Sequence, residues 1–468
     1  MAREITTEEK ASAQEMLQRA RTAMNGIEHY DQARVDHLCR AVSWATANEN
    51  TFVALTQMSV DESKMGSAEG GKARRFKIVG ILRDALRQKS IGVIEELPEK
   101  GIVKYAKPAG VIAGLLPVTN PVVTMVAMAI NGIKCRDAIV FSPHPASRRT
   151  ALETTRILRA ALHKQGAPED LIQCIDKPSI PLAQELMSIC DLTVATGGSA
   201  MVKAAYSSGK PAYGVGAGNA TMIIDETADI AEAAANTRIS KTHNNGSGCS
   251  CDGNLVVEDS IYDRFLEQLQ TEGGYLASEE DKRRLQSVMW DAENHRTLET
   301  VARSAAVIAG KAGFALPDGK TFIIVPEDKI GKEHVFSGEK LSPVLAIFRY
   351  RGFDIALNMI SRIFEVGGKG HSCGIYSFDA GHIHKLALMA PVSRIMVRQP
   401  QVRGNAGSFT NGMPMTASLG CGTWGGNITS ENIGVKHFMN VTWVSQPIPE
   451  DKPSEQEIFQ EFYNSETF

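Results

Sequence analysis

The sequence predicts an α/β protein built on parallel sheets in a doubly wound arrangement. Apolar segments of strand length, such as 138–142 and 192–196, alternate with segments of helical periodicity, such as 147–162 and 180–187. This alternation is typical of parallel strands joined by helices. The chain has 468 residues, too many for one ordinary hydrophobic core, so we expect two or three packed domains.

The first hundred residues predict a helical layer, because apolar residues recur at three- and four-residue spacing over 16–24 and over 78–86. Segment 101–114 predicts a strand, a turn at Pro108-Ala109-Gly110 and a second buried strand. A second α/β unit is expected to begin near Ala228. The expected units are 1–100 with 115–227 as a first domain, 228–431 as a second, 101–114 with 435–446 as strands outside both, and 447–468 as a tail.

The tail is acidic and begins with a proline-rich linker, but it also carries a helix signal. Ser454 to Glu457 form a capping box, and Ile458, Phe459, Phe462 and Tyr463 follow on one helical face. We expect a helix that docks on its own or a neighbouring subunit. The alternative is a free peptide for recruitment into a larger assembly.

Composition excludes several classes of partner. A formal charge of −3 and a pI near 6.4 give no field that would gather nucleic acid or an anionic membrane. The eight cysteines are scattered, which favours reduced thiols over a disulfide framework. The chain starts without an apolar core of signal-peptide length and contains no apolar run of about 18 residues. We therefore expect a soluble, cytoplasmic protein that binds neither nucleic acid nor membrane.

Cys249 is the strongest candidate for a catalytic residue. It ends a small, polar, glycine-containing run, 240–249, and a buried-strand pattern resumes at Leu255. A cysteine on such a loop can be reached by a small molecule, and a thiolate is a good nucleophile. The preceding stretch 211–219 contains no carboxylate that could activate water. An acyl group carried on Cys249 would therefore pass more plausibly to another thiol than to water.

The segment 191–211, followed by Gly214-Val215-Gly216-Ala217-Gly218-Asn219, resembles the coenzyme-A-acylating branch of the aldehyde dehydrogenase superfamily. Further matching segments, in the same order and spacing, are 117–121, 142–145, 339–345 and 419–427. The resemblance runs from about residue 100 to about residue 445. It implies an aldehyde dehydrogenase-like fold of two doubly wound α/β domains plus a β-flap for oligomerisation, formed by 101–114 and 435–446. A homodimer or a dimer of dimers is then expected.

The resemblance also implies a reaction in which Cys249 attacks an aldehyde, a hydride leaves to NAD or NADP, and coenzyme A takes the acyl group from the enzyme thioester. Asn120 and the Cys249 backbone N–H are the expected oxyanion donors, although Asn120-Pro121 could also be a simple turn. His371 matches a histidine of acylating relatives that could deprotonate the coenzyme A thiol; an exposed loop histidine is the alternative. Cys249 and Cys251 could form a metal or redox pair, but only His243 lies nearby as a further ligand, so we expect no metal.

The dinucleotide site lacks a G-x-G-x-x-G motif. Instead, Thr196-Gly197-Gly198-Ser199 follows a strand and starts a helix, where a pyrophosphate could approach the helix N-terminus. Arg148 and Arg149 stand near the expected adenosine ribose, and no carboxylate does, so the sequence leaves NAD and NADP open. The residues expected at the dinucleotide are Pro117, Val118, Thr119, Ser142, His144, Thr196, Gly197, Gly198, Ser199 and Glu339, with Glu339 on the nicotinamide ribose.

The segment 397–410 is expected over the mouth of the aldehyde channel and is unusually polar. Its candidate substrate residues are Arg398, Arg403, Asn405 and Ser408. Arginine pairs well with a carboxylate or sulfonate, so sulfoacetaldehyde is the preferred substrate and succinic semialdehyde the second. Solvated surface arginines are the alternative, with acetaldehyde or propionaldehyde as substrate. Two other functions stay open: hydrolysis of the thioester to a free acid, and a non-catalytic scaffold.

Overall fold

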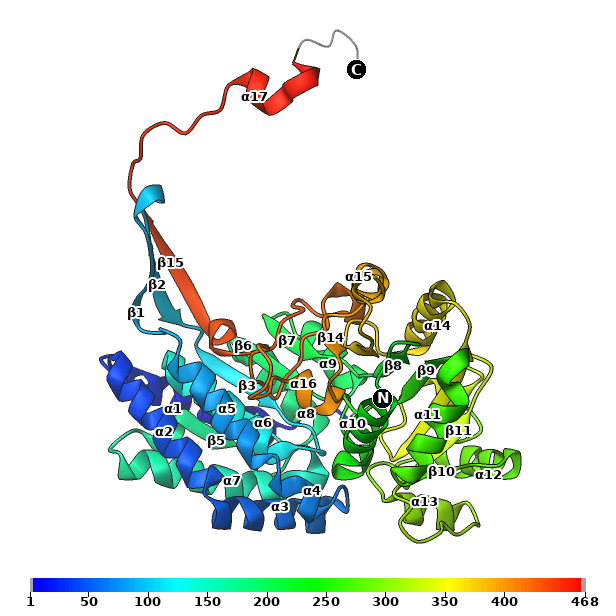
Figure 1. Ribbon diagram of the computed structural model, residues 1–468. Coiled ribbons are helices and arrows are strands. Elements are labelled where there is room, and N and C mark those ends of the chain that lie inside the picture. The colour runs from blue at the N-terminus through cyan, green and yellow to red at the C-terminus, as the bar shows by residue number, and fades with distance from the viewer. Residues whose placement is uncertain (1–2, 464–468) are drawn as a thin grey trace.

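The computed structural model describes residues 3–463, and these form three sheets (Figure 1). A five-stranded sheet has the order β5-β4-β3-β6-β7, and a seven-stranded sheet has the order β10-β11-β12-β9-β8-β13-β14. Neighbouring strands are parallel in both. A third sheet, β1-β2-β15, is antiparallel. The predicted α/β class with parallel sheets is confirmed.

The chain enters the five-stranded sheet at its central strand. Its strands are β3 (Val111–Leu115), β4 (Ala138–Ser142), β5 (Ile172–Cys174), β6 (Leu192–Thr196) and β7 (Ala212–Val215). They are joined by α6 (Pro121–Cys135), α7 (Arg148–Lys164), α8 (Ile180–Ile189) and α9 (Ser199–Tyr206). The chain winds from β3 through β4 to β5, then returns to β6 and β7 on the other side. Ligands bind outside the carboxyl ends of strands at such a reversal.

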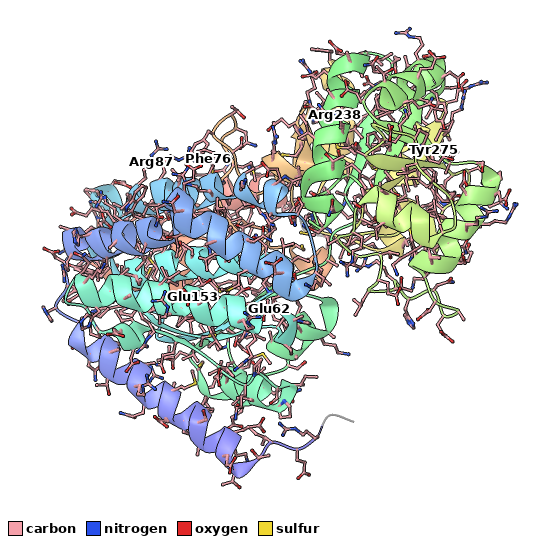
Figure 2. All side chains as sticks on the ribbon, turned by 90° about the horizontal axis from the view of Figure 1, so that it is seen from below. Glu62, Phe76, Arg87, Glu153, Arg238 and Tyr275 are labelled. Atoms are coloured by element: carbon pink, nitrogen blue, oxygen red, sulfur yellow. The ribbon has the colours of Figure 1, made fainter. Side chains whose placement is uncertain are left out.

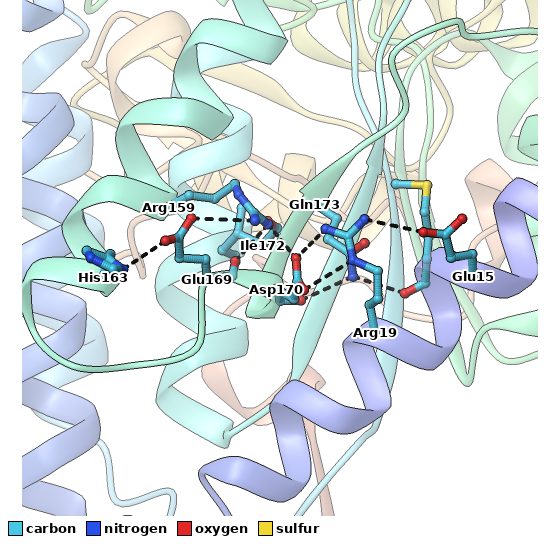
Figure 3. Close-up of polar contacts among 9 residues, drawn as sticks. Glu15, Arg19, Arg159, His163, Glu169, Asp170, Ile172 and Gln173 are labelled. Atoms are coloured by element: carbon cyan, nitrogen blue, oxygen red, sulfur yellow. Dashed lines mark hydrogen bonds and ion pairs between the residues drawn. The ribbon is translucent and has the colours of Figure 1, made fainter.

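The N-terminal helices cover this sheet and bury α6 completely. They are α1 (Thr7–Gly26), α2 (Gln32–Ala47), α3 (Glu49–Ser63), α4 (Ala68–Lys72) and α5 (Arg75–Leu86), seen from below in Figure 2. Arg19 of α1 forms a 2.6 Å ion pair with Asp170, which also pairs with Arg159 of α7 at 2.8 Å (Figure 3). These contacts help to fix the helical layer against the sheet.

The seven-stranded sheet is covered on both faces. Its strands are β8 (Thr221–Ile224), β9 (Asn254–Glu258), β10 (Gly274–Leu276), β11 (Phe322–Pro326), β12 (Val344–Tyr350), β13 (Cys373–Tyr376) and β14 (Ile395–Val397). The accompanying helices are α10 (Ile230–Thr242), α11 (Asp259–Thr271), α12 (Glu279–Met289), α13 (Ala305–Lys311), α14 (Phe353–Val366), α15 (Ala380–Met389) and α16 (Gln401–Gly404). Alternate strand residues enter two separate apolar clusters, with Val256 in one and Leu255 in the other. A parallel sheet buried on both faces has this pattern.

The structure corrects the expected hairpin at 101–114. Only β2 (Ile102–Pro108) belongs to the antiparallel sheet, where it pairs with β1 (Gly92–Leu97), a strand expected to be helical. The residues after it form β3, the first strand of the five-stranded sheet. Gly110 allows the turn with φ of +126°, and its N–H donates to Asp137 Oδ1 at 2.9 Å.

The expected domain limits also shift. Strand β8 belongs to the seven-stranded sheet, so the second unit begins before 228. The chain then returns to the first unit well before 431, because Met415, Ile433 and Val435 lie in the core of the five-stranded sheet and its helices. The strand expected at 435–446 starts only at β15 (Met439–Ser445), after the 3-10 turn η7 (Val435–Phe438).

The antiparallel sheet and the tail extend away from the two α/β units (Figure 1). β15 is an edge strand, and Trp443 on it is 58% exposed. Over its described residues, 447–463, the tail contains the short helix α17 (Glu455–Phe459) and the 3-10 turn η8 (Gln460–Phe462). Ile458 and Phe459 are 59% and 53% exposed, so the tail does not dock on its own subunit as one expectation had it. Residues 464–468 of the expected tail lie outside the described residues.

Two further findings bear on the expected environment of the protein. In residues 3–463, no helix combines the length and apolar character needed to cross a membrane. All eight cysteines are free.

Candidate active site

Cys249 lies on a tightly folded loop between α10 and β9. The loop begins with η4 (His243–Gly246), in which Asn244 and Asn245 both adopt positive φ, a conformation that asparagine tolerates better than most residues. The Nδ2 of Asn245 donates to the carbonyls of Gly66 and Ala302, at 3.1 and 3.2 Å. These bonds anchor the loop on both α/β units.

The glycines of segment 214–219 let that segment approach the Cys249 loop closely. A Cβ on Gly218 would lie 1.9 Å from the Cys249 carbonyl oxygen, so no other residue fits there without a shift of the backbone. Glu339 places a carboxylate at this approach, because its Oε1 accepts a 3.2 Å hydrogen bond from the Gly218 N–H.

A cavity of about 550 Å³ opens in front of Cys249. It is lined by residues around the start of α5, by the β3–α6 loop, by the cysteine loop and by segment 402–419. Thr119, Asn120 and Cys249 all face this cavity, so the structure brings these predicted site residues together.

Cys249 is in direct contact with His371. The Nε2 of His371 is 3.1 Å from the Cys249 Sγ, and its Nδ1 is 2.8 Å from the Ser372 Oγ. Ser372 in turn accepts a 2.8 Å hydrogen bond from Asn405 Nδ2. His371, Ser372 and Asn405 are fully buried, which excludes the exposed-histidine interpretation.

The thiol and the imidazole are both neutral at physiological pH. Burial, more than any neighbouring charge, raises the pKa of Cys249 to about 12. Burial and then the charge of Arg394 lower the pKa of His371 to about 3. Desolvation thus outweighs the hydrogen bonding at this loop that would favour a thiolate. The thiol must therefore lose its proton as it attacks, with His371 as the adjacent acceptor.

The side chain of Asn120 does not make a helix cap. Asn120 occupies the N-cap position of α6, yet its side chain makes no capping hydrogen bond. Its Oδ1 instead accepts a 2.9 Å bond from Arg74 Nη1. No described residue accepts a hydrogen bond from Asn120 Nδ2, which leaves this N–H available to a ligand in the cavity. The side-chain contacts thus favour the oxyanion-donor interpretation over the simple turn.

Three cations surround the same cavity: Arg74, Lys77 and Arg403. Among residues 3–463, no aspartate or glutamate lines it. Burial and then the charges of these three residues lower the pKa of His243, which also lines the cavity, to about 4. Burial lowers the pKa of Lys77 to about 8, which keeps most of this side chain charged at pH 7. Sequence reasoning missed Arg74 and Lys77, because the helical pattern of their segment gave no sign that these two side chains would line the same cavity as Cys249.

The four candidate substrate residues divide into two pairs. Arg403 and Ser408 line the cavity, as expected. Arg398 does not, because its Nε is 2.8 Å from Glu232 Oε2 and its guanidinium stacks 3.7 Å above the Phe378 ring. Asn405 is buried beneath His371 rather than placed at the channel mouth.

A second cavity, of about 520 Å³, lies beside helix α9. Lys203, Gly216, Lys369 and Trp424 line it. Glu365 also lines it and forms an ion pair with Lys369, so Lys203 is the lining lysine that no described residue pairs with. Lys203 suits one anionic group of a ligand, and the half-exposed Trp424 offers a flat apolar surface.

The cavity residues just named are not among those expected at the dinucleotide, several of which lie instead along the carboxyl ends of the strands. The Leu116 N–H donates to the Ser142 carbonyl at 3.1 Å, which aligns the ends of β3 and β4, and His144 follows in the next turn. Thr196 ends β6, and its hydroxyl is bonded to that of Ser418. Glu339 pairs with Arg296 at 3.3 Å. Of the described groups that could hold a metal ion, none includes Cys249 or Cys251.

Of the two arginines near the expected ribose site, Arg148 has its guanidinium engaged, whereas no described residue pairs with the exposed guanidinium of Arg149. Glu62 accepts hydrogen bonds from the Arg149 and Thr150 backbone N–H groups, at 2.7 and 2.8 Å, and so caps the start of α7 (Glu62 is labelled in Figure 2). Arg148 forms a 2.6 Å ion pair with Asp176. Sequence reasoning did not foresee this carboxylate at the helix N-terminus.

Two doubly wound units, a half-buried thiol with a neighbouring imidazole and amide, and a separate second cavity beside α9 are features expected of a dehydrogenase that works through an enzyme thioester. Residues 2–418 match the Aldehyde dehydrogenase family, and the chain belongs to that family of oxidoreductases. The resemblance identified in the sequence is confirmed.

Similar proteins match nearly the whole length of the chain. A sulfoacetaldehyde dehydrogenase of an Acholeplasma species is 43% identical over 95% of this chain and 93% of its own. A succinate-semialdehyde dehydrogenase (acetylating) of Clostridium kluyveri is 34% identical over 96% and 99% of the two chains. The crystal structure of an acetylating aldehyde dehydrogenase from Geobacillus thermoglucosidasius matches with a TM-score of 0.92 at 34% identity, covering 96% of this chain and 99% of the other.

Proposed function

We propose that the protein is a coenzyme-A-acylating aldehyde dehydrogenase that oxidises a short aldehyde with an anionic tail. Sulfoacetaldehyde is the first candidate and succinic semialdehyde the second. The observation that carries this proposal is the cavity in front of Cys249, which holds three cations and no carboxylate. The names of the similar proteins point to the same two aldehydes.

The first half of the reaction uses the contacts of Cys249. Its Sγ attacks the aldehyde carbon while the thiol proton passes to His371 Nε2, which lies 3.1 Å away. The carbonyl oxygen becomes an oxyanion, which Asn120 Nδ2 and the Cys249 N–H stabilise by hydrogen bonds. NAD or NADP supplies the hydride acceptor when bound. Loss of the hydride converts the thiohemiacetal into a thioester on Cys249, and His371 then releases its proton to solvent.

Coenzyme A completes the cycle. His371 accepts the proton of the coenzyme A thiol, the resulting thiolate attacks the thioester carbonyl, and Cys249 leaves as a thiolate that recovers its proton from His371. The hydrolytic alternative needs a base for water. The carboxylate at the Gly218 approach, Glu339, is held by Arg296 and by the Gly218 N–H, which supports transfer to a thiol.

Arg403 is the proposed anchor for the anionic tail, with Lys77 beside it. No described residue forms an ion pair with Arg403, so its guanidinium is available to a sulfonate or carboxylate. Lys77 already donates to the carbonyls of Ala406 and Gly407, at 2.9 and 2.6 Å. It therefore contributes positive charge to the cavity and not a second bidentate pair of donors.

For the dinucleotide we propose a preference for NAD over NADP. A 2′-phosphate near Ser142 and His144 would need free cations or backbone N–H groups. The α7 N-terminus is instead capped by the carboxylate of Glu62, which would repel a 2′-phosphate, and Arg148 is paired with Asp176. Of the two arginines, Arg149 alone keeps a guanidinium that no described residue pairs with, and it is exposed to solvent. Comparison of kcat/KM for the two nucleotides at one aldehyde concentration tests this proposal.

For assembly we propose a homodimer or a dimer of dimers formed through β1, β2 and β15. β15 leaves one row of backbone groups unpaired, and Val441 and Trp443 on it are exposed. Edges of this kind are normally paired or covered. Light scattering on the full chain tests the proposal, which an active monomer would contradict.

The central experiment measures nucleotide reduction with a panel of short aldehydes, with and without coenzyme A. We expect reduction that depends on coenzyme A and a kcat/KM highest for the aldehydes with anionic tails. Rapid turnover without coenzyme A would favour hydrolysis to the free acid. Absence of turnover with every aldehyde, together with a Cys249 that resists alkylation even at high pH, would favour a non-catalytic scaffold.

A further inference from the structure

We propose that Arg74 is a positioning residue for the oxyanion donor Asn120, because its guanidinium holds the Asn120 Oδ1 and so turns the amide NH₂ towards the reacting carbonyl. The inference rests on the acylating reaction proposed above but not on the identity of the aldehyde. Arg74 lies 46 residues before Asn120 in the sequence, and no motif connects the two residues.

The orientation of the amide follows from the chemistry of the two groups. Arg74 Nη1 is 2.9 Å from Asn120 Oδ1 and 3.1 Å from the Thr119 carbonyl oxygen. A guanidinium has only donors, so an amide that contacts it must present its oxygen. The NH₂ group then points away from Arg74. Asn120 and Cys249 line the same cavity, so an aldehyde bound to Cys249 would meet this NH₂.

The hydrogen bonds of the Arg74 side chain all go to the loop that carries Asn120. Among residues 3–463, no carboxylate forms an ion pair with Arg74, and its hydrogen bonds go to Thr119 and Asn120. Burial lowers its pKa to about 10, which leaves the guanidinium charged at neutral pH. A buried charge against the amide oxygen polarises the amide, and it makes the opposite N–H a stronger donor.

Arg74 could instead bind the tail of the substrate, as we propose for Arg403. The two roles differ in what they act on. A positioning role at the reacting carbonyl affects every aldehyde equally and lowers kcat. A tail-binding role affects only aldehydes that carry an anionic tail and raises KM for them.

The experiment compares Arg74→Met and Arg403→Met on sulfoacetaldehyde and on propionaldehyde. We expect Arg74→Met to lower kcat by about tenfold to a hundredfold on both aldehydes, somewhat less than the full loss of one oxyanion donor. Arg403→Met should raise KM for sulfoacetaldehyde alone. A loss in Arg74→Met that is confined to KM for the charged aldehyde would overturn the inference.

A double-mutant cycle tests the pairing itself. Arg74→Met should cause little further loss in an Asn120→Ala background, because the donor that it positions is gone. Full additivity of the two losses would overturn the inference. Arg75→Met is the matched control, since Arg75 is the next residue, donates to the Ala47 carbonyl and does not line the cavity; it should keep the wild-type kcat.

A conservative variant guards against simple loss of folding. Arg74→Lys keeps the charge and one donor, so an intermediate kcat with a wild-type melting temperature supports the inference, while a kcat as low as that of Arg74→Met would contradict it. The proposed substrate class fails separately: a wild-type enzyme that shows no preference for charged aldehydes overturns that class, yet it leaves the propionaldehyde test of Arg74 intact.

Discussion

The Nε2 of His371 and the Sγ of Cys249 are 3.1 Å apart and meet as a neutral imidazole and a neutral thiol, because His371 is fully buried and desolvation also dominates the pKa of the half-buried Cys249. An ion pair of thiolate and imidazolium would need the pKa of Cys249 to lie below that of His371. Burial moves the two pKa values in the opposite directions, to about 12 and about 3. The enzyme without ligands should therefore be unreactive until a substrate is in place.

This neutral pair predicts how alkylation of Cys249 depends on pH. Only the thiolate reacts with iodoacetamide, and its fraction rises about tenfold per pH unit below the thiol pKa. We expect labelling of the nucleotide-free enzyme to be slow at pH 7 and to increase steeply towards pH 9. Mass spectrometry of the labelled peptide measures the rate of labelling at each pH. Fast labelling that is already constant from pH 6 would indicate a thiolate–imidazolium pair instead.

Cys249→Ser should abolish acyl-CoA formation and leave nucleotide binding nearly intact, because only the nucleophile is lost. The matched control is Cys251→Ser. Cys251 is two residues away and buried, and its Sγ faces the His243 carbonyl at 4.0 Å. Most of the activity should survive in this control. The reverse result for the two variants would reassign the nucleophile.

Asn120→Ala should lower kcat by about 10²–10³, the usual loss for one oxyanion donor, with a smaller change in KM. The fold should tolerate the change, because the side chain makes no cap to α6. Steady-state kinetics with a melting curve measure both quantities. An unchanged kcat would return Asn120 to the role of a turn residue.

The sequence predicted the residues of the reacting centre better than the charged residues that line the cavity around it. Cys249, Asn120 and His371 lie in segments with distinctive composition, and the structure brings Cys249 into contact with His371 and places Asn120 on the same cavity. Arg74 and Lys77 come from a segment that predicted only a helix. Their position follows from packing of the helical layer against the sheet, which no local pattern encodes.

The wrong assignments have a similar origin. Arg398 and Asn405 lie in a polar segment, and polarity alone cannot tell a channel mouth from a buried network or a surface ion pair. Arg398 forms an ion pair with Glu232, and Asn405 donates a hydrogen bond to Ser372. β3 was expected in a hairpin because the turn signal before it is strong. The parallel partners of β3 on either side, β4 and β6, are 27 or more residues away.

Asp252 should make stability depend on pH. Burial raises its pKa to about 7, and its Oδ2 has no hydrogen-bond partner. A carboxyl whose pKa is higher in the folded state contributes stability that is fully present below about pH 4 and is lost as pH rises through about 7, by about 1.4 kcal/mol per pH unit in between. Asp252→Asn removes this loss.

The melting temperature of Asp252→Asn relative to wild type should therefore increase from pH 5 to pH 8. Asp259→Asn is the control of opposite sign. Hydrogen bonds from Arg349 and Arg351 lower the pKa of Asp259, so this variant should lose stability at pH 7 and recover relative to wild type as the pH falls below the usual range of a carboxyl group. A difference for Asp252→Asn that stays constant with pH would show that Asp252 ionises normally.

Truncation after Gln446 tests the role of the tail. The strand β15 ends at Ser445 and would remain, so the α/β units and the antiparallel sheet should be kept. Ile458 and Phe459 are exposed on the tail, and the tail extends away from its own subunit (Figure 1). Since a short helix with an apolar face is not stable alone in water, we expect it to pack on a neighbouring subunit.

The truncated protein should then melt at a lower temperature or form a smaller oligomer by light scattering, with Ile458→Ser and Phe459→Ser giving the same direction of change. An unaltered enzyme would instead assign the tail to recruitment by another protein.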